Sequence, residues 1–222
     1  MREETSKARV FIVDDHPIVR QGLAQLIATE PDLLLCGEAS DVRTALLGIV
    51  AEKADIAIID LSLGTGDGIE LIKSVRAQAP QVRFVVLTIF DDALHLERAV
   101  LAGAQGFLTK QEAPGEVLTA VREVLEGRMY LSRRVSPKLL MRLLHAPGAE
   151  ADSPIGRLSD RELQVFQLVG EGKATKEIAE LLHLSVKTIE SYRANIKEKL
   201  ELADAGDLSR YAMRWVLSHE QE

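Results

Sequence analysis

The sequence predicts an α/β domain built on a five-stranded, parallel, doubly wound sheet, followed by a smaller all-α domain of four helices. Two observations carry this prediction. From residue 9 onward, short β-branched runs alternate with longer amphipathic stretches, as in βα units stacked around a parallel sheet. After residue 156 no strand-like alternation occurs, and short helical stretches are interrupted by glycines and capping residues.

Five strands are expected, one at the start of each βα unit. Their ranges are Val10–Val13, Leu33–Gly37, Ile56–Asp60, Phe84–Thr88 and Gly106–Thr109. The first, third and fourth are nearly continuous apolar runs, which is typical of strands that are buried on both faces.

Amphipathic helices are expected between these strands and after the last one. The stripes that predict three of them are Ile18, Gly22 and Leu26; Ile69, Ile72, Val75 and Arg76; and Leu94, Arg98 and Leu101. Pro114 stands where the first turn of the fifth helix tolerates proline, and Gly127 is expected to end that helix.

The chain is divided at a segment rich in proline, glycine and small residues, which runs from Ala146 to Gly156. A short helix is expected just before it, from Pro137 to His145. We place the first domain at residues 1–130, the helix and flexible linker at 131–156, and the second domain at 157–222.

The first helix of the second domain is expected after Ser159, because Ser159 and Glu162 have the spacing of a capping box. Leu163, Phe166 and Val169 form its apolar stripe. Thr175 is expected to cap the next helix. The apolar side of that second helix is expected to comprise Ile178, Ala179, Leu181 and Leu182.

A third helix is expected from Ser185 to Leu200, after a short turn at His183 and Leu184. Its inward stripe is expected to comprise Val186, Ile189, Ile196 and Leu200. The opposite face is expected to comprise Lys187, Glu190, Ser191 and Ala194. This outward face is polar with one small residue, as a helix entering the DNA major groove requires. A generic helical bundle would show the same amphipathic pattern.

Composition excludes several classes of protein. The 222 residues are 46% hydrophobic and 27% charged, which is ordinary for a globular chain. The single cysteine, Cys36, cannot form an internal disulfide or a metal–thiolate cluster. The longest apolar runs fall far short of the roughly 20 residues that span a bilayer, and the first residues lack the pattern of a signal peptide. We therefore expect a cytoplasmic protein without a membrane partner.

Charged and hydroxyl side chains follow the strands of the first domain. Asp14 and Asp15 follow the first strand, Asp60 ends the third, Thr88 ends the fourth, and Lys110 follows the fifth. Ligands of doubly wound sheets bind beyond these strand ends. Three carboxylates in one pocket repel one another unless a cation neutralises them, and oxygen ligands suit Mg²⁺. An aspartate can also attack a phosphoryl group as a nucleophile. The cluster thus predicts a Mg²⁺ site and a phosphorylated aspartate, although Asp14 and Asp15 alone would suit a helix N-cap.

The motifs around these residues are Val-Asp-Asp-His-Pro at 13–17, Asp60, Leu-Thr at 87–88, and Gly-Phe-Leu-Thr-Lys at 106–110. Over about residues 8–128 the chain resembles the receiver domain of two-component response regulators. The resemblance implies that Asp60 is the phosphoacceptor and that Asp14, Asp15, Asp60 and the Ser62 carbonyl hold Mg²⁺. It further implies that Thr88 and Lys110 contact the phosphoryl group and that Thr88 and Phe107 form the switch.

The chain departs from the receiver pattern in two places. Gly64 stands where the family commonly has proline, four residues after the phosphoacceptor, which predicts a less restrained loop. Ile89 and Phe90 follow Thr88, where receivers usually carry a small residue and often a polar one. We expect these two bulky side chains to restrict access to Asp60.

The second domain carries Leu-Ser-Asp-Arg-Glu-Leu at 158–163, Lys-Glu-Ile-Ala-Glu-Leu-Leu at 176–182 and Leu-Ser-Val-Lys-Thr-Ile-Glu-Ser at 184–191. It resembles a LuxR-type DNA-binding domain, and together with the receiver this is the layout of NarL/FixJ-type response regulators. The resemblance implies DNA contacts by Lys187, Thr188, Glu190, Ser191 and Ala194. It also implies that the last helix, with Tyr211 and Trp215, helps dimerisation; Trp215 would equally suit the core.

The expected function is therefore transcription control by a response regulator. Its expected partners are a sensor histidine kinase, double-stranded promoter DNA, a second copy of the chain when active, and RNA polymerase. It is not expected to be an enzyme beyond its own phosphoryl transfer and dephosphorylation. An enzymatic phosphatase would call for an acid two residues after Asp60, where Ser62 stands. The alternative is an atypical LuxR-type regulator that acts without phosphorylation.

Overall fold

The computed structural model describes residues 7–64, 66–89, 93–133 and 154–220. The chain divides into two compact units, residues 1–142 and 143–222. The division falls inside the segment predicted as a helix and linker. The expected helix from Pro137 to His145 lies outside the described residues.

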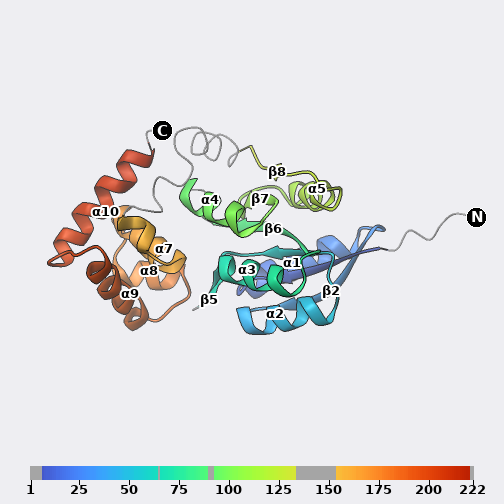
Figure 1. The fold of residues 1–222 in the computed structure, drawn as a ribbon, viewed down its shortest axis with the longest axis horizontal. Coiled ribbons are helices and arrows are strands. Elements are labelled where there is room, and N and C mark those ends of the chain that lie inside the picture. The colour runs from blue at the N-terminus through green and yellow to red at the C-terminus, as the bar shows by residue number, and fades with distance from the viewer. Residues whose placement is uncertain (1–6, 65, 90–92, 134–153, 221–222) are drawn as a thin grey trace, which may run out of the picture. The chain divides into compact units, whose positions relative to one another are not determined.

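The first unit is built on a parallel sheet with the strand order β2-β1-β3-β6-β7-β8 (Figure 1). The strands are β1 Ala8–Val13, β2 Leu33–Ala39, β3 Ile56–Ile59, β6 Arg83–Thr88, β7 Gly106–Thr109 and β8 Tyr130–Leu131. The five predicted strands and their parallel arrangement are confirmed. The sheet changes its direction of growth between β1 and β3, which is where ligands of doubly wound sheets bind.

The predicted number of strands in this sheet is wrong by one, because β8 adds a sixth strand at its edge. It runs parallel to β7, with Gly106 opposite Tyr130 and Phe107 opposite Leu131. A strand of two residues is too short for the alternation of apolar and polar residues that predicts longer strands.

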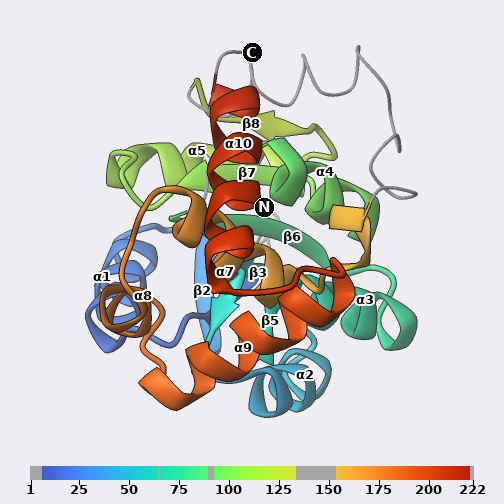
Figure 2. The same ribbon diagram turned by 90° about the vertical axis from the view of Figure 1, so that its left-hand side faces the viewer.

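Helices cover both faces of the sheet. They are α1 Pro17–Ala28, α2 Val42–Ala51, α3 Gly68–Gln78, α4 Ala93–Ala102 and α5 Pro114–Leu125. The buried residues form two apolar clusters, one shared with α1 and α5 and the other with α2, α3 and α4. Figure 2 shows these two sets of helices on opposite sides of the sheet. The predicted doubly wound fold is confirmed.

Two of the predicted helix stripes are wrong in detail. Ile18 is 84% exposed and Gly22 is exposed, whereas Leu23 and Ile27 are buried. In α4, Leu101 is 73% exposed. A single row of residues spaced by four does not fix which side of a helix faces the sheet, and glycine contributes no apolar side chain to the row. The α3 stripe is confirmed at Ile69, Ile72 and Val75, while Arg76 is exposed.

The second unit contains four described α-helices, as predicted. A 3-10 helix at Pro154–Arg157 precedes α7 Asp160–Gly170, α8 Thr175–Leu181, α9 Val186–Lys199 and α10 Ala205–Glu220. The last residues of the segment predicted as a flexible linker therefore lie in a 3-10 helix. Ser159 and Glu162 form the predicted capping box: each side chain accepts a hydrogen bond from the other residue's backbone amide.

Three local predictions in this unit are wrong. Thr175 is the first helical residue of α8, and the cap is Ala174, whose amide donates to the Glu177 carboxylate. Leu181 is 44% exposed and Val186 is 43% exposed, although both were expected to face inward. These two residues lie beside the turn between α8 and α9. The helical periodicity that predicted their inward position is interrupted at this turn. Within the described residues, no helix combines the length and apolar character needed to cross a membrane.

Candidate functional site

An acidic pocket lies at the carboxyl ends of the two central strands β1 and β3. Asp14, Asp15 and His16 follow β1, and Asp60 follows β3. One ligating atom from each of these four residues lies within 4.8 Å of the others. Asp14 and Asp60 are each only 2% exposed. The structure thus brings together the three carboxylates that the sequence predicted. We call Asp14, Asp15, His16 and Asp60 the acidic pocket.

Lys110, the residue after β7, reaches into the acidic pocket. Its Nζ lies 2.7 Å from Asp14 Oδ2 and 2.7 Å from Asp60 Oδ2. Burial lowers the pKa of the Lys110 amine, but the charges of Asp60 and Asp14 outweigh burial, so the pKa is raised overall. Lys110 is therefore a fixed positive charge between two buried carboxylates.

The Asp60 carboxylate is held on both of its oxygens. Oδ2 accepts from Lys110, and Oδ1 accepts from the Ser62 amide at 3.0 Å. Burial raises the pKa of Asp60 to about 6, partly offset by the Lys110 charge and reinforced by the nearby Asp14 charge. At pH 7 this carboxylate is mostly ionised, and it gains a proton in mildly acidic solution.

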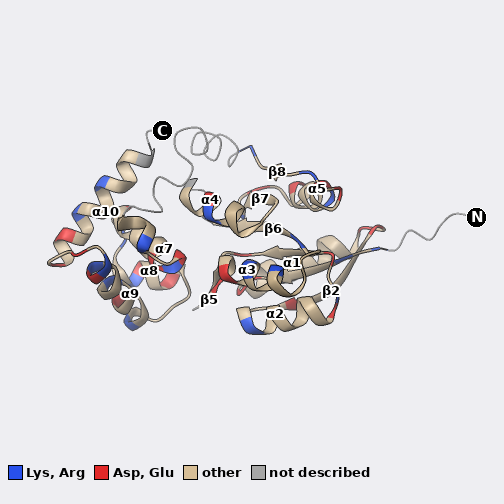
Figure 3. Ribbon diagram, in the orientation of Figure 1, with Lys and Arg blue, Asp and Glu red and all other residues tan. Residues whose placement is uncertain are grey.

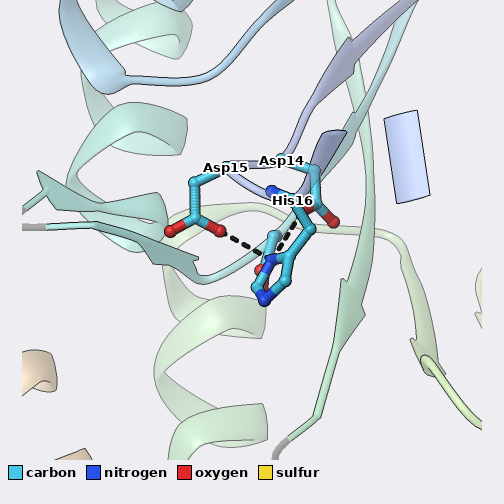
Figure 4. Close-up of side chains that lie close together, drawn as sticks. Asp14, Asp15 and His16 are labelled. Carbon is cyan, nitrogen blue, oxygen red and sulfur yellow. Dashed lines mark hydrogen bonds and ion pairs between the residues drawn. The ribbon is translucent and has the colours of Figure 1, made fainter. Parts of the chain in front are cut away.

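His16 belongs to the acidic pocket, although the sequence analysis gave it no role. Its Nδ1 lies 3.0 Å from Asp14 Oδ1 and 2.7 Å from Asp15 Oδ1, between the two carboxylates (Figure 4). The sequence also did not predict the contact of Arg20, whose guanidinium donates a hydrogen bond to the Asp14 backbone carbonyl at 2.6 Å. His16 directly follows Asp15, but one histidine beside a carboxylate pair does not show from sequence where its ring points.

Of the remaining predicted residues, Thr88 and Ser62 lie at or near the same strand ends, whereas Phe107 lies two residues before the end of β7. Thr88 is 1% exposed at the end of β6, and its carbonyl accepts from the Lys110 amide at 2.8 Å. Ser62 is 5% exposed in a short strand just after Asp60. Phe107 is fully buried in the cluster between the sheet and α2, α3 and α4. Phe107, the expected switch residue, therefore lies inside the core in this conformation.

The donor set of the acidic pocket suits a hard divalent cation. Three carboxylates supply oxygen ligands, and the buried Asp15 Oδ1 lies 2.7 Å from His16 Nδ1, a further member of the acidic pocket. Cations such as Mg²⁺ favour oxygen ligands over nitrogen or sulfur. This pocket could therefore bind a metal ion.

The two bulky residues after Thr88 are only partly described. Ile89 is 43% exposed, and Phe90 lies outside the described residues. We predict that Ile89→Ala speeds uptake of a phosphoryl group from a small donor by a factor of a few, because a smaller side chain leaves more room at the strand end. The measurement is the time course of phosphoprotein formation by intact-protein mass spectrometry. An unchanged rate would mean that Ile89 points away from Asp60.

The second candidate site is the helix-turn-helix made by α8 and α9. At the turn, His183 has a positive φ of 51°, and the Leu184 amide donates to the Ala179 carbonyl at 2.8 Å. Ser185 caps α9 by accepting from the Thr188 amide at 3.0 Å. Ile189 and Ile196 are fully buried, which turns the opposite face of α9 outward.

The predicted outward face of α9 is exposed. Its four residues are Lys187, Glu190, Ser191 and Ala194. The Ser191 hydroxyl donates to the Lys187 carbonyl at 3.0 Å, so its proton is used within the helix and its lone pairs remain for an outside donor. Thr188 is half-buried and its hydroxyl lies 2.7 Å from the Ser185 hydroxyl, which makes it part of the cap. Figure 3 shows residues of both charges on α9.

Two aromatic residues of α10 pack inside their own unit. Tyr211 and Trp215 have ring centroids 5.9 Å and 5.7 Å from that of Phe166 in α7. Both side chains are half-buried. This packing gives Trp215 the core role considered from the sequence, and the dimerisation role of α10 stays a prediction.

Comparison with known proteins identifies both units. Residues 10–122 match the response regulator receiver domain, and residues 156–212 match the bacterial regulatory proteins of the luxR family. The chain is a response regulator of the LuxR family. One similar protein is the transcriptional regulatory protein LiaR of Bacillus subtilis, which is 35% identical over 93% of this chain and 97% of its own length.

Two further relatives share both halves of this response regulator. The transcriptional activator DevR/DosR of Mycobacterium tuberculosis is 35% identical over 86% of this chain and 88% of its own length. The solved structure of the response regulator RcsB in complex with DNA matches with a TM-score of 0.56 and 30% identity, over 93% of this chain and 98% of that one.

Proposed function

We propose that this response regulator accepts a phosphoryl group on Asp60 from a sensor histidine kinase, and that phosphorylation strengthens dimerisation and promoter binding. The observation that carries the proposal is the buried Asp60 carboxylate, held at 2.7 Å by Lys110 beside Asp14 and Asp15. The protein would act in the cytoplasm, with RNA polymerase as a further partner. Beyond its own phosphoryl transfer and dephosphorylation it would not be an enzyme.

In the proposed transfer, a carboxylate oxygen of Asp60 attacks the phosphorus of a phosphohistidine. A new O–P bond forms, the P–N bond breaks, and its electron pair returns to the imidazole nitrogen. Since the pKa of Asp60 is about 6, the attacking carboxylate is mostly ionised at pH 7. Lys110 is placed to balance the negative charge of the phosphoryl oxygens, and the Thr88 hydroxyl is proposed to donate to one of them.

Mg²⁺ is the proposed cofactor. Asp14, Asp15 and Asp60 would hold it together with the Ser62 carbonyl, which the receiver resemblance assigns to this role. When bound, the ion would offset the charge that gathers on the phosphoryl oxygens. The clustering of these carboxylates supports this assignment, because one ligating atom from each residue of the acidic pocket lies within 4.8 Å of the others.

The experiment that tests the proposal compares the full chain with and without beryllofluoride, a phosphoryl mimic, in the presence of Mg²⁺. We predict about 5- to 150-fold tighter binding to selected DNA, or the same shift in the monomer–dimer equilibrium, as expected for a coupling of about 1–3 kcal/mol. Fluorescence anisotropy and sedimentation measure the two quantities. Equal affinity and equal mass in both states would support a regulator that acts without phosphorylation.

DNA reading is proposed to rest on the exposed face of α9. We predict that Glu190→Ala relaxes the preference at one base position by roughly 1–3 kcal/mol, because a carboxylate in the groove accepts from the amino group of cytosine. Lys187→Ala should weaken binding to all sequences and reduce the salt slope by about one unit if the lysine contacts a phosphate. Binding-site selection with each variant separates the two roles. An unchanged base preference in Glu190→Ala would leave Glu190 as a residue of the helix surface only.

A further inference from the structure

The position four residues after Asp60 has an unusual geometry. In this chain Gly64 stands where receivers commonly have proline, and it follows β4 Ser62–Leu63 in a hairpin with β5 Gly66–Asp67. Gly64 has a φ of +57°. Two-residue hairpin turns of the favoured types need a positive φ at their first position, whereas proline is locked near −65°. Proline could not form this turn.

The Gly64 amide holds a carboxylate of the acidic pocket. Its N–H donates to Asp15 Oδ2 at 2.8 Å, over a sequence separation of 49 residues. Two residues earlier, the Ser62 amide donates to Asp60 Oδ1 at 3.0 Å. One short strand and its turn therefore supply backbone donors to two different carboxylates of the pocket. Proline has no N–H and could not make the bond to Asp15.

The hairpin that carries these donors is anchored at its base. The Gly68 amide donates to the Leu61 carbonyl at 3.1 Å, which closes the loop. Asp67 caps α3 by accepting from the Ile69 amide at 2.8 Å, and Leu63 is 2% exposed. Because the base of the hairpin is fixed, the turn presents the Gly64 amide from a defined position. That amide holds Asp15 Oδ2, while the other carboxylate oxygen, Oδ1, lies beside His16.

We propose that the backbone amide of Gly64 is a positioning group for Asp15, and that it raises the affinity of the acidic pocket for a divalent cation. By fixing one carboxylate oxygen, it limits the rotation of the other, so less conformational freedom is lost when the cation binds. The proposal rests on the metal site put forward above.

Two substitutions at this position form a matched pair. Gly64→Pro removes the N–H and forbids the positive φ, whereas Gly64→Asn keeps the N–H, and asparagine tolerates this backbone region. Among the described residues other than its chain neighbours, a Cβ at Gly64 would meet only Asp15 Oδ2, at 4.0 Å. The asparagine side chain therefore has room to leave the backbone on that side. A difference in metal affinity between the two variants therefore reflects the loss of the amide N–H and of the turn, and not the size of the added side chain.

The measurement is Mn²⁺ binding to the full chain by electron paramagnetic resonance of the free ion, with Mg²⁺ as competitor. Gly64→Pro should weaken binding by about tenfold or more, as expected when a group that orients a metal ligand is lost. Gly64→Asn should stay within about threefold of the parent. In an Asp15→Ala background, Gly64→Pro should cause no further loss, because the amide acts through that carboxylate.

The outcomes separate this inference from the proposed function. If the parent binds no Mn²⁺, the metal site itself is wrong. If the parent binds but Gly64→Pro and Gly64→Asn bind equally, the metal site stands and the role of Gly64 is wrong. If melting in EDTA shows that Gly64→Pro does not fold, hydrogen exchange decides: Asp15→Ala should speed exchange of the Gly64 amide by about tenfold or more. Unchanged exchange would overturn the inference.

Discussion

Replacing Asp60 with asparagine should abolish phosphorylation of the chain altogether. Asparagine keeps the shape of the side chain, but its neutral amide cannot attack phosphorus to form an acyl phosphate. The parent, incubated with acetyl phosphate and Mg²⁺, should gain the mass of one phosphoryl group, and the group should be lost in acid or alkali as acyl phosphates are. Asp60→Asn should gain none.

Two controls separate loss of the nucleophile from damage to the pocket. Asp14→Asn removes a neighbouring carboxylate but leaves Asp60 in place, so labelling should slow without changing its site. EDTA should suppress labelling of the parent if Mg²⁺ is needed. Labelling of Asp60→Asn at the parental rate would place the phosphoacceptor elsewhere, and peptide mapping after borohydride reduction would then locate it.

The same substitution should stabilise the metal-free protein, by an amount that depends on pH. The pKa of Asp60 is about 6 in the folded protein against 3.8 for an ordinary aspartate, chiefly because the carboxyl is buried, and despite the Lys110 charge. The folded state therefore binds the Asp60 proton more tightly than the unfolded state. The contribution of Asp60 to the free energy of unfolding is fully present below pH 3.8 and is lost as the pH rises through about 6.

Above pH 7 this loss amounts to about 3 kcal/mol, since the shift is about two pKa units. Asp60→Asn removes the charge, so its free energy of unfolding should exceed that of the parent by up to about 3 kcal/mol at pH 8, and the difference should shrink toward pH 4. Urea denaturation in EDTA measures it. The other titratable groups facing Asp60 are Lys110, Asp14, Asp15 and His16, and they are the same in both proteins.

Asp32→Asn is a control for which we expect the opposite effect on the free energy of unfolding. A hydrogen bond from Arg122 lowers the pKa of Asp32 below its usual value of 3.8. Asp32→Asn should therefore destabilise the protein at neutral pH, with a difference that fades as the pH falls below 3.8. If Asp60→Asn is instead destabilising at pH 8, the attraction between Lys110 and the Asp60 carboxylate outweighs the cost of its burial.

Much of this protein could be predicted from its sequence, because the deciding signals are local. Runs such as Phe84–Thr88 are apolar enough to mark buried parallel strands, and Ser159 with Glu162 marks the start of a helix. In a parallel sheet all strands end at one edge, so acids that follow neighbouring strands such as β1 and β3 lie close together. On this basis Asp14, Asp15 and Asp60 are predicted to lie close together, and the structure confirms it.

Other features depend on contacts between distant residues. The two-residue strand β8 exists because it pairs with β7, and the outward turn of Ile18 follows from how α1 lies on the sheet. The ring of His16 lies between Asp14 and Asp15, and the Gly64 amide reaches Asp15, a residue 49 positions away. The pKa of Asp60 depends on burial and on Lys110, 50 positions away. Residue types and their spacing determined which carboxylates meet. Side-chain directions, backbone donors such as the Gly64 amide, and charge environments arise only when separate elements pack, so the tertiary structure alone decided them.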